Sequence, residues 1–310
     1  MQATNNSGKT NINNSNFEIK PGSVQFMEAD EDKKTDYAHS KVVIIPAGLE
    51  NTTSYMQGTR QGPKAIIDAS TQVELYDEEL KSEPIDLGIF TLEDLAFEGK
   101  SQEEALALIG AAFSKVTDDG KFAVTLGGEH SVTIPIIRDL KERYPDLVVL
   151  SFDAHGDLRI TYHGELSHAC VMRRIADMSV PVYIVGVRSI SPEEVQFVES
   201  NPRAEILYDY ERAEKAFDIN QILQWGKHVY VTVDLDAFDP AEMPSVGTPE
   251  PGGLRWREFF KIFKEVCEKT EVVGFDIMEL MPVKGQERAD FYAAKLIYKM
   301  LGYLRRAGQL

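Results

Sequence analysis

The sequence predicts an α/β fold in which a parallel sheet is covered by helices on both faces. Two observations lead to this fold class. Short, continuous apolar runs rich in β-branched residues recur along the chain, and such runs are typical of strands that are buried on both faces. Amphipathic stretches of helical length separate these runs, and strands that alternate with helices indicate βαβ units.

Six apolar runs are predicted to be strands. In chain order they are KVVIIPAG (41–48), FAVTLGG (122–128), LVVLSFD (147–153), VPVYIVGV (180–187), HVYVTVDLD (228–236) and EVVGFDIME (271–279). Helical periodicity is clearest over residues 102–116, 131–143, 255–269 and 288–306. Because we find no internal repeat and no interior linker, we expect residues 39–310 to form a single domain.

Residues 1–38 differ from the rest of the chain. They are rich in Asn, Ser and charged residues and contain few apolar ones, so we expect a flexible N-terminal arm.

The composition restricts the classes of partner. The 310 residues include 50 acidic and 33 basic ones, giving a net charge of −17, which disfavours nucleic acid and membranes as partners and mildly favours a small cationic substrate. The two cysteines, Cys170 and Cys267, have no metal-type spacing and imply no disulfide framework. With no long apolar stretch and no signal-peptide pattern, we expect a cytoplasmic protein.

Polar residues cluster where four of the predicted strands end, in the segments GGEH, DAHGD, DLD and DIME. Ligands of open parallel sheets bind beyond the carboxyl ends of the strands, so these segments should meet at one edge. Alternate side chains of a strand share a face, which would bring Asp153, His155 and Asp157 together, and likewise Asp234 and Asp236. His130, after a Gly-Gly turn, completes six candidate metal ligands.

The donor set favours two metal ions over one. A catalytic zinc ion takes three protein ligands, whereas carboxylates shared between two divalent ions suit a set of six. Four carboxylates also balance the charge of two divalent cations. Mixed His and Asp donors favour Mn²⁺, Fe²⁺, Co²⁺ or Ni²⁺ over Mg²⁺ and Ca²⁺. Each motif alone also fits a capped strand end, a turn or a helix start; their occurrence at successive strand ends favours the metal.

Three segments resemble the signatures of the ureohydrolase family, which contains arginases and agmatinases. They are LGGEHSVT (126–133), VLSFDAHGD (149–157) and TVDLDAFDPAEMPSVGTPEPGG (232–253), and the resemblance runs from about residue 41 to the C-terminus. It implies a three-layer α/β/α fold with a central, mainly parallel eight-stranded sheet. It also implies a binuclear Mn²⁺ centre, hydrolysis of a guanidinium group to urea and an amine, and a homo-oligomer, trimeric or hexameric.

The resemblance also implies a role for each residue. It gives His130 and Asp157 to the first ion, His155 and Asp236 to the second, and makes Asp153 and Asp234 the bridges. Water shared by two such ions loses its proton near neutral pH, and a histidine can then protonate the leaving amine. His168, just before the helical segment 169–178, fits this shuttle better than His163, and Glu279 resembles the carboxylate that clamps the guanidinium.

Arginine-specific members present Asn and Ser in the loop that leads to the shuttle histidine. Here that loop, LRITYHGELSH, has no Asn and only Ser167, and GTPEPGGL (247–254) resembles agmatinases. We therefore expect hydrolysis of agmatine to urea and putrescine, a step of polyamine biosynthesis. Arg159 leaves alternatives open: it pairs with Glu165 or another carboxylate, or it receives an anionic tail such as that of 4-guanidinobutyrate. Aminopropylagmatine is a further alternative, and arginine fits less well.

Two other classes of protein are weaker interpretations. A metal-dependent deacetylase has a related fold but relies on one Zn²⁺ and a pair of adjacent histidines, which this sequence lacks. A catalytically silent scaffold would not need all six ligands, His168 and Glu279 intact.

Overall fold

One parallel sheet forms the centre of the molecule, in a computed structural model that describes residues 17–27, 33 and 36–310. The strands are β1 (Val42–Ala47), β2 (Ile89–Thr91), β3 (Phe122–Gly127), β4 (Leu147–Phe152), β5 (Val182–Val187), β6 (Ala204–Tyr208), β7 (His228–Asp234) and β8 (Glu271–Met278). They form an eight-stranded sheet in the order β2-β1-β3-β8-β7-β4-β5-β6, with every pairing parallel. The predicted fold class is confirmed.

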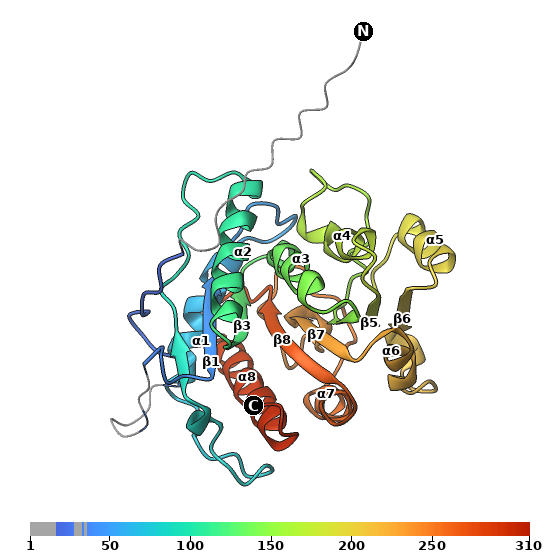
Figure 1. Cartoon of the computed structure of the whole chain (residues 1–310). Coiled ribbons are helices and arrows are strands. Elements are labelled where there is room, and N and C mark those ends of the chain that lie inside the picture. Colours follow the sequence, from blue (N-terminus) through green and yellow to red (C-terminus); the bar gives the residue numbers. More distant parts are fainter. Residues whose placement is uncertain (1–16, 28–32, 34–35) are drawn as a thin grey trace.

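Helices cover both faces of this sheet (Figure 1). They are α1 (Gly62–Ser70), α2 (Gln102–Asp118), α3 (Thr133–Arg143), α4 (Val171–Asp177), α5 (Pro192–Ser200), α6 (Ile219–Trp225), α7 (Trp256–Lys269) and α8 (Arg288–Arg306). Alternate residues of a strand enter different cores. Val42 and Ile44 belong to the core that includes residues of α1, α6, α7 and α8, and Val43 and Ile45 to the core that includes residues of α2 to α5. The molecule is therefore a three-layer α/β/α structure.

The sequence predicted the central elements better than the edges. All six apolar runs are strands, and the four periodic segments correspond to α2, α3, α7 and α8. The two strands that we did not derive from apolar runs, β2 and β6, are the outermost strands of the sheet. One has only three residues and the other leaves Glu205 partly exposed, so neither shows a continuous apolar run.

Part of the predicted N-terminal arm packs against the domain. Phe26 and Met27 are buried, and their backbone N–H groups donate hydrogen bonds of 2.8 Å to Thr91 Oγ1 and Ser70 Oγ. Burial of these two apolar side chains fixes the segment, so residue 38 does not mark where packing begins. Residues 1–16 of the arm lie outside the described residues.

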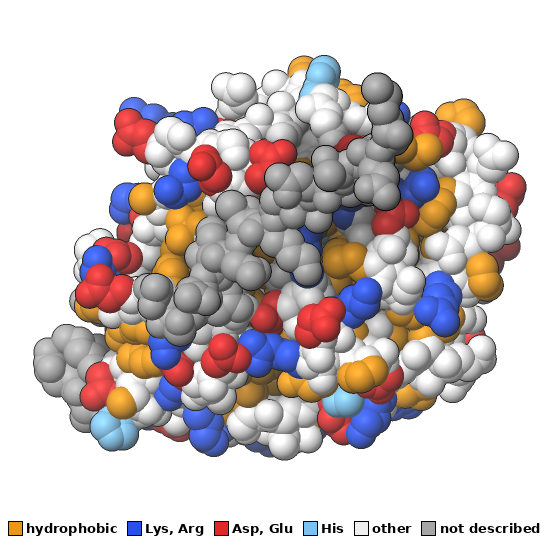
Figure 2. Space-filling view, turned by 45° about the horizontal axis from the view of Figure 1, so that its top comes forward, with side chains coloured by type: hydrophobic (Ala, Val, Ile, Leu, Met, Phe, Trp, Pro, Cys, Tyr) orange, Lys and Arg blue, Asp and Glu red, His pale blue; other side chains and the backbone are white. Residues whose placement is uncertain are grey.

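The acidic excess of the composition forms no continuous patch on the face shown in Figure 2. Asp and Glu side chains of the described residues are interspersed there with Lys and Arg. Among the helices of the described ranges, none has the length and apolar character required to cross a membrane.

Candidate metal centre and active site

The four polar segments predicted to meet follow four adjacent strands. β3, β8, β7 and β4 are neighbours at the middle of the sheet, and their carboxyl ends lie at the same edge. The strand register fixes the relative heights of the side chains: Asp234 pairs with Met278, one residue before Glu279. Because all four strands are buried and parallel, side chains that are far apart in sequence share one small volume.

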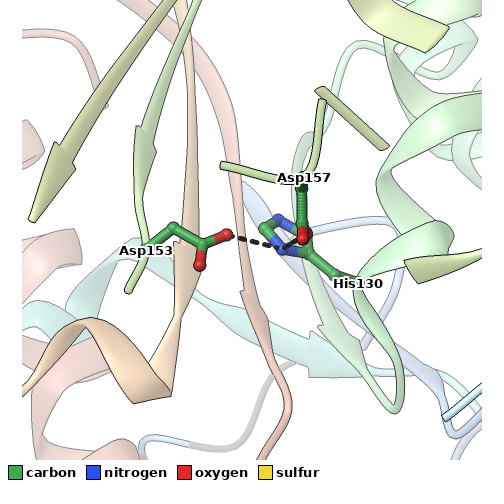
Figure 3. Close-up of side chains that lie close together, drawn as sticks. All are labelled: His130, Asp153 and Asp157. Carbon is green, nitrogen blue, oxygen red and sulfur yellow. Dashed lines mark ion pairs between the residues drawn. The ribbon is translucent and has the colours of Figure 1, made fainter. Parts of the chain in front are cut away.

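Three carboxylates surround one ring nitrogen of His130. Its Nδ1 lies 3.2 Å from Asp153 Oδ2, 3.3 Å from Asp157 Oδ2 and 3.4 Å from Asp234 Oδ2. Figure 3 shows Asp153 and Asp157 directed at this nitrogen from different segments of the chain. His130, Asp153 and Asp157 form a group whose ligand atoms all lie within 4.8 Å of one another.

A second group lies beside the first and shares one residue with it. His155 Nδ1 is 2.9 Å from Asp236 Oδ2 and 3.7 Å from Asp153 Oδ1, and these three residues also lie within the 4.8 Å limit. Asp153 therefore belongs to both groups. A carboxylate placed between two ligand groups is the arrangement that a pair of divalent ions requires.

The carboxylates are oriented by backbone hydrogen bonds. Asp153 Oδ1 accepts from the N–H of His155 at 2.6 Å, and Asp234 Oδ1 from that of Asp236 at 2.9 Å. Asp236 Oδ1 accepts from the N–H of Ala154 at 3.0 Å. Each of these carboxylates thus uses one oxygen to fix its position and turns the other towards a histidine, as outer-sphere contacts do in metal sites.

Burial of so many ionisable groups perturbs their protonation. Burial and the charge of Asp153 raise the pKa of Asp157 to about 7. Burial and the neighbouring carboxylates of Asp236 and Asp153 also raise the pKa of Asp234 well above its ordinary value. For His155, burial alone would lower the pKa, but Asp236 and Asp153 outweigh it and raise the value to about 12. The cluster thus favours additional positive charge.

The donor set fits a pair of divalent cations. His130 Nδ1 and Asp153 Oδ2 are buried and lie 3.2 Å apart, but within the described ranges neither makes a hydrogen bond of good geometry. Buried polar atoms without partners are costly unless a ligand satisfies them. Both atoms belong to the first group, and two imidazoles with four carboxylates are donors suited to first-row transition metals.

The backbone at two site residues is strained. Asp157 and Glu279 have φ angles of 50° and 64°, in the left-handed region that residues other than glycine rarely adopt. Glu194, almost fully buried, accepts the N–H of Leu158 at 2.9 Å and so holds the segment after Asp157. The N–H of Glu279 donates to Gly128 O at 2.8 Å. Such strain costs roughly 1–3 kcal/mol per residue and is concentrated at functional sites.

A cavity of 190 Å³ opens onto the two ligand groups. Four of the predicted ligands line it: His155, Asp157, Asp234 and Asp236. The other lining residues are His168, Glu279, Arg159, Tyr162, Ser54, Ser189, Ile190, Thr248, Gly156, Ala169 and Glu194. Both residues that were predicted to act on the substrate, His168 and Glu279, therefore face the same space as four of the six predicted ligands. The cavity is small and mostly polar, as a site for a short charged substrate should be.

His168 and Glu279 lie side by side in this cavity. Glu279 Oε1 accepts the backbone N–H of His130 at 2.8 Å and lies 3.9 Å from His168 Nδ1. Burial raises the pKa of Glu279 well above its usual range, and burial lowers the pKa of His168. His168 Nε2 is buried without a hydrogen-bond partner among the described residues, so it is free to exchange a proton with a bound molecule.

Other residues of the same loop point elsewhere. His163 is exposed and its ring contacts Tyr162 at a centroid distance of 4.7 Å. Ser167 is buried and donates to Cys170 Sγ at 3.3 Å instead of facing the cavity. Arg159 lies over the ring of Tyr162, with Cζ 5.4 Å from the ring centroid.

The suggested ion pair of Arg159 with Glu165 is wrong. Glu165 lies 3.4 Å from Arg174 instead, because α4 places Arg174 beside the loop. Within the described ranges, Arg159 has no ion pair.

Sequence reasoning missed the residues that support this site from other loops. Glu129 is fully buried and accepts hydrogen bonds from the N–H groups of Asn51 and Thr52 and from the Thr52 hydroxyl. Thr52 Oγ1 in turn accepts the N–H of His168 at 3.0 Å. The only sequence signal was an acidic residue directly before His130. The cavity residues Ser54 and Ser189 lie in no motif, and Thr248 lies in GTPEPGGL (247–254) but was given no role there.

Comparisons with known proteins agree with this geometry. Residues 40–302 match the model of the arginase family. The chain is 38% identical to an N(1)-aminopropylagmatine ureohydrolase of Synechocystis, over 91% of this chain and 94% of that protein. It is 34% identical to an agmatinase of Bacillus anthracis, over 86% and 92%. The solved agmatine ureohydrolase of Thermoplasma volcanium superimposes with a TM-score of 0.80 at 29% identity, covering 94% of this chain and 96% of that one.

The shared position of Asp153 predicts different metal contents for two variants. Asp153→Ala should abolish tight binding of both ions. Asp157→Ala should weaken the binding of one ion and leave the other bound. Each loss should exceed the roughly 10–100-fold change that follows removal of an outer-sphere partner. Manganese content after dialysis, measured by atomic emission, checks this. Equal retention of metal by Asp153→Ala and the parent would contradict the shared role.

Proposed function

Because the chain belongs to the arginase family of amidinohydrolases, we propose that it hydrolyses the guanidinium group of agmatine or of N1-aminopropylagmatine with two Mn²⁺ ions. Urea is one product; the other is putrescine from agmatine, or its aminopropyl derivative, spermidine. The observation that carries the proposal is that Asp153 belongs to both ligand groups, whose members His155, Asp157 and Asp236 line the same cavity as His168 and Glu279.

His130 and Asp157 would hold one ion, His155 and Asp236 the other, and Asp153 and Asp234 would lie between them. When bound, the two metal ions would lower the pKa of a water molecule, which could then attack the guanidinium carbon at neutral pH. The assignment of Asp153 is supported by its contacts with both histidines. Asp234 contacts His130 at 3.4 Å, and its bridging role stays a prediction.

Glu279 and His168 would act on the substrate. The Glu279 carboxylate is a planar acceptor for two N–H donors of a guanidinium. Burial raises the pKa of Glu279, and a bound guanidinium cation would favour its charged form again. The lowered pKa of His168 keeps the imidazole neutral at pH 7, so it can take a proton and pass it to the leaving amine. The 3.9 Å between His168 and Glu279 would place the shuttle beside the clamped group.

Two observations bear on the substrate tail. Agmatine is the substrate expected from the sequence, and its single primary amine suits a loop that turns Ser167 away from the cavity. The similarity to aminopropylagmatine ureohydrolases favours the longer substrate, which carries a second amine. Both tails are cationic and lack a carboxylate. The predicted homo-oligomer and cytoplasmic location stay expectations from the sequence.

Substrate preference is tested with urea release from agmatine, aminopropylagmatine, arginine and 4-guanidinobutyrate in the presence of Mn²⁺. We expect kcat/KM for one of the first two to exceed that for arginine by about 10²-fold or more, roughly 2.7 kcal/mol. The reason is that arginine's carboxylate would lose water without gaining neutral hydrogen-bond donors from the loop. Preference for arginine or 4-guanidinobutyrate would contradict the proposal.

Arg159→Ala supplies the control for the tail. If the guanidinium of Arg159 only stacks on Tyr162, the variant keeps the substrate order of the parent. If 4-guanidinobutyrate is the best substrate of the parent and the variant loses that activity alone, the enzyme is a guanidinobutyrase.

His168→Gln should slow turnover by about 10²–10⁴-fold, the usual contribution of a general acid–base, while retaining both metal ions. The matched control is His163→Gln, five residues earlier in the same loop, which should behave like the parent because His163 is exposed. Single-turnover urea release and manganese content measure the two effects. Loss of turnover in His163→Gln but not in His168→Gln would reverse the assignment.

A further inference from the structure

A row of buried polar side chains crosses the four central strands directly beneath the candidate metal centre. Register pairs place Thr125 of β3 beside Asp276 of β8, Asp276 beside Thr232 of β7, and Thr232 beside Ser151 of β4. All four are fully buried in strands that are otherwise apolar. Thr232 and Ser151 each lie two residues before an aspartate of the site, on the same face of the strand. The proposed reaction gives none of the four a role.

Thr232 connects this row to His130. Its Oγ1 lies 2.8 Å from His130 Nε2, on the side of the imidazole opposite the three carboxylates. His130 can bind a metal ion through Nδ1 only if that atom carries no proton. The ring proton must then be on Nε2, where Thr232 Oγ1 is the acceptor. A hydroxyl oxygen that accepts a hydrogen bond from this N–H can still donate its own hydrogen to another acceptor.

Asp276 lies between Thr125 and Thr232 and supplies the row's one carboxyl group. Its Oδ2 accepts from the Thr133 hydroxyl at 2.8 Å and from the Tyr230 hydroxyl at 2.9 Å. Its Oδ1 is buried and has no hydrogen-bond partner within the described ranges, so it remains available to the neighbouring Thr232. The Thr133 and Thr232 hydroxyls are 3.5 Å apart, which closes the network.

We propose that Thr232 and Asp276 are positioning residues that hold His130 in the tautomer and orientation required for metal binding. The Nε2–H of His130 donates to Thr232, and the Thr232 hydroxyl is oriented by Asp276. Metal-bound histidines generally donate their second N–H to an oxygen in this manner, and loss of such a partner weakens metal binding by about 10–100-fold. The inference rests on the proposed function, because it assumes the metal pair.

The test is a Mn²⁺ titration of the full-length protein in which free Mn²⁺ is followed by electron paramagnetic resonance. Thr232→Val is nearly isosteric but removes the acceptor, so we expect the ion beside His130 to bind about 10–100-fold more weakly. Thr232→Ser keeps the hydroxyl and should restore the affinity of the parent. Asp276→Asn should also weaken the binding of this ion. If Thr232→Val does not fold, Asp276→Asn replaces it in the comparison with the parent.

Tyr230→Phe is the matched control. It removes one hydrogen bond from the same carboxylate, at an equally buried position, and leaves the path from His130 to Asp276 intact. We expect its thermal midpoint to fall while its Mn²⁺ affinity stays that of the parent. The inference is overturned if Thr232→Val binds Mn²⁺ like the parent, or if Tyr230→Phe weakens binding as much as Thr232→Val. Failure of the parent itself to bind Mn²⁺ would overturn the proposed function instead.

Discussion

The repulsion among four buried aspartates is the constraint on which the rest of the site depends. Asp153 is fully buried and Asp157, Asp234 and Asp236 are at most 8% exposed. Removing even one carboxylate from water costs several kcal/mol unless a positive charge compensates it. The two histidines supply part of this compensation, and the raised pKa values of Asp157 and Asp234 show that it is incomplete. Two divalent cations would neutralise four carboxylates.

The central strands hold the carboxylates close together in spite of this repulsion, because the rigid backbone does not allow them to move apart. The backbone hydrogen bonds to Asp153, Asp234 and Asp236 anchor one oxygen of each, and adjacent parallel strands set their spacing. Gly128 contributes through its size, since a Cβ there would collide with the carbonyl oxygen of Leu49. A scaffold of this rigidity holds ligands ready before the metal binds, and so reduces the cost of ordering them.

The sequence was sufficient for the parts of the site that depend on local periodicity. Asp153 was found because it directly follows an apolar strand. The expected strand alternation does not continue, however: β4 ends at Phe152, and Asp157 reaches the same site with a φ of 50°. The support of the site depends on contacts between distant segments, which no local pattern reports. Glu129 holds Thr52, which lies 116 residues from His168 and yet accepts its N–H. The strained backbone of Asp157 likewise follows from tertiary contacts, because nothing in DAHGD indicates a positive φ.

The central claim is that Asp153 lies between two metal ions, and anomalous scattering from crystals soaked in Mn²⁺ tests it most directly. We predict two anomalous peaks about 3.5–4 Å apart. One should lie beside His130 and Asp157, the other beside His155 and Asp236, and the carboxylate of Asp153 should contact both. A single peak, or two peaks of which Asp153 contacts only one, would contradict the account.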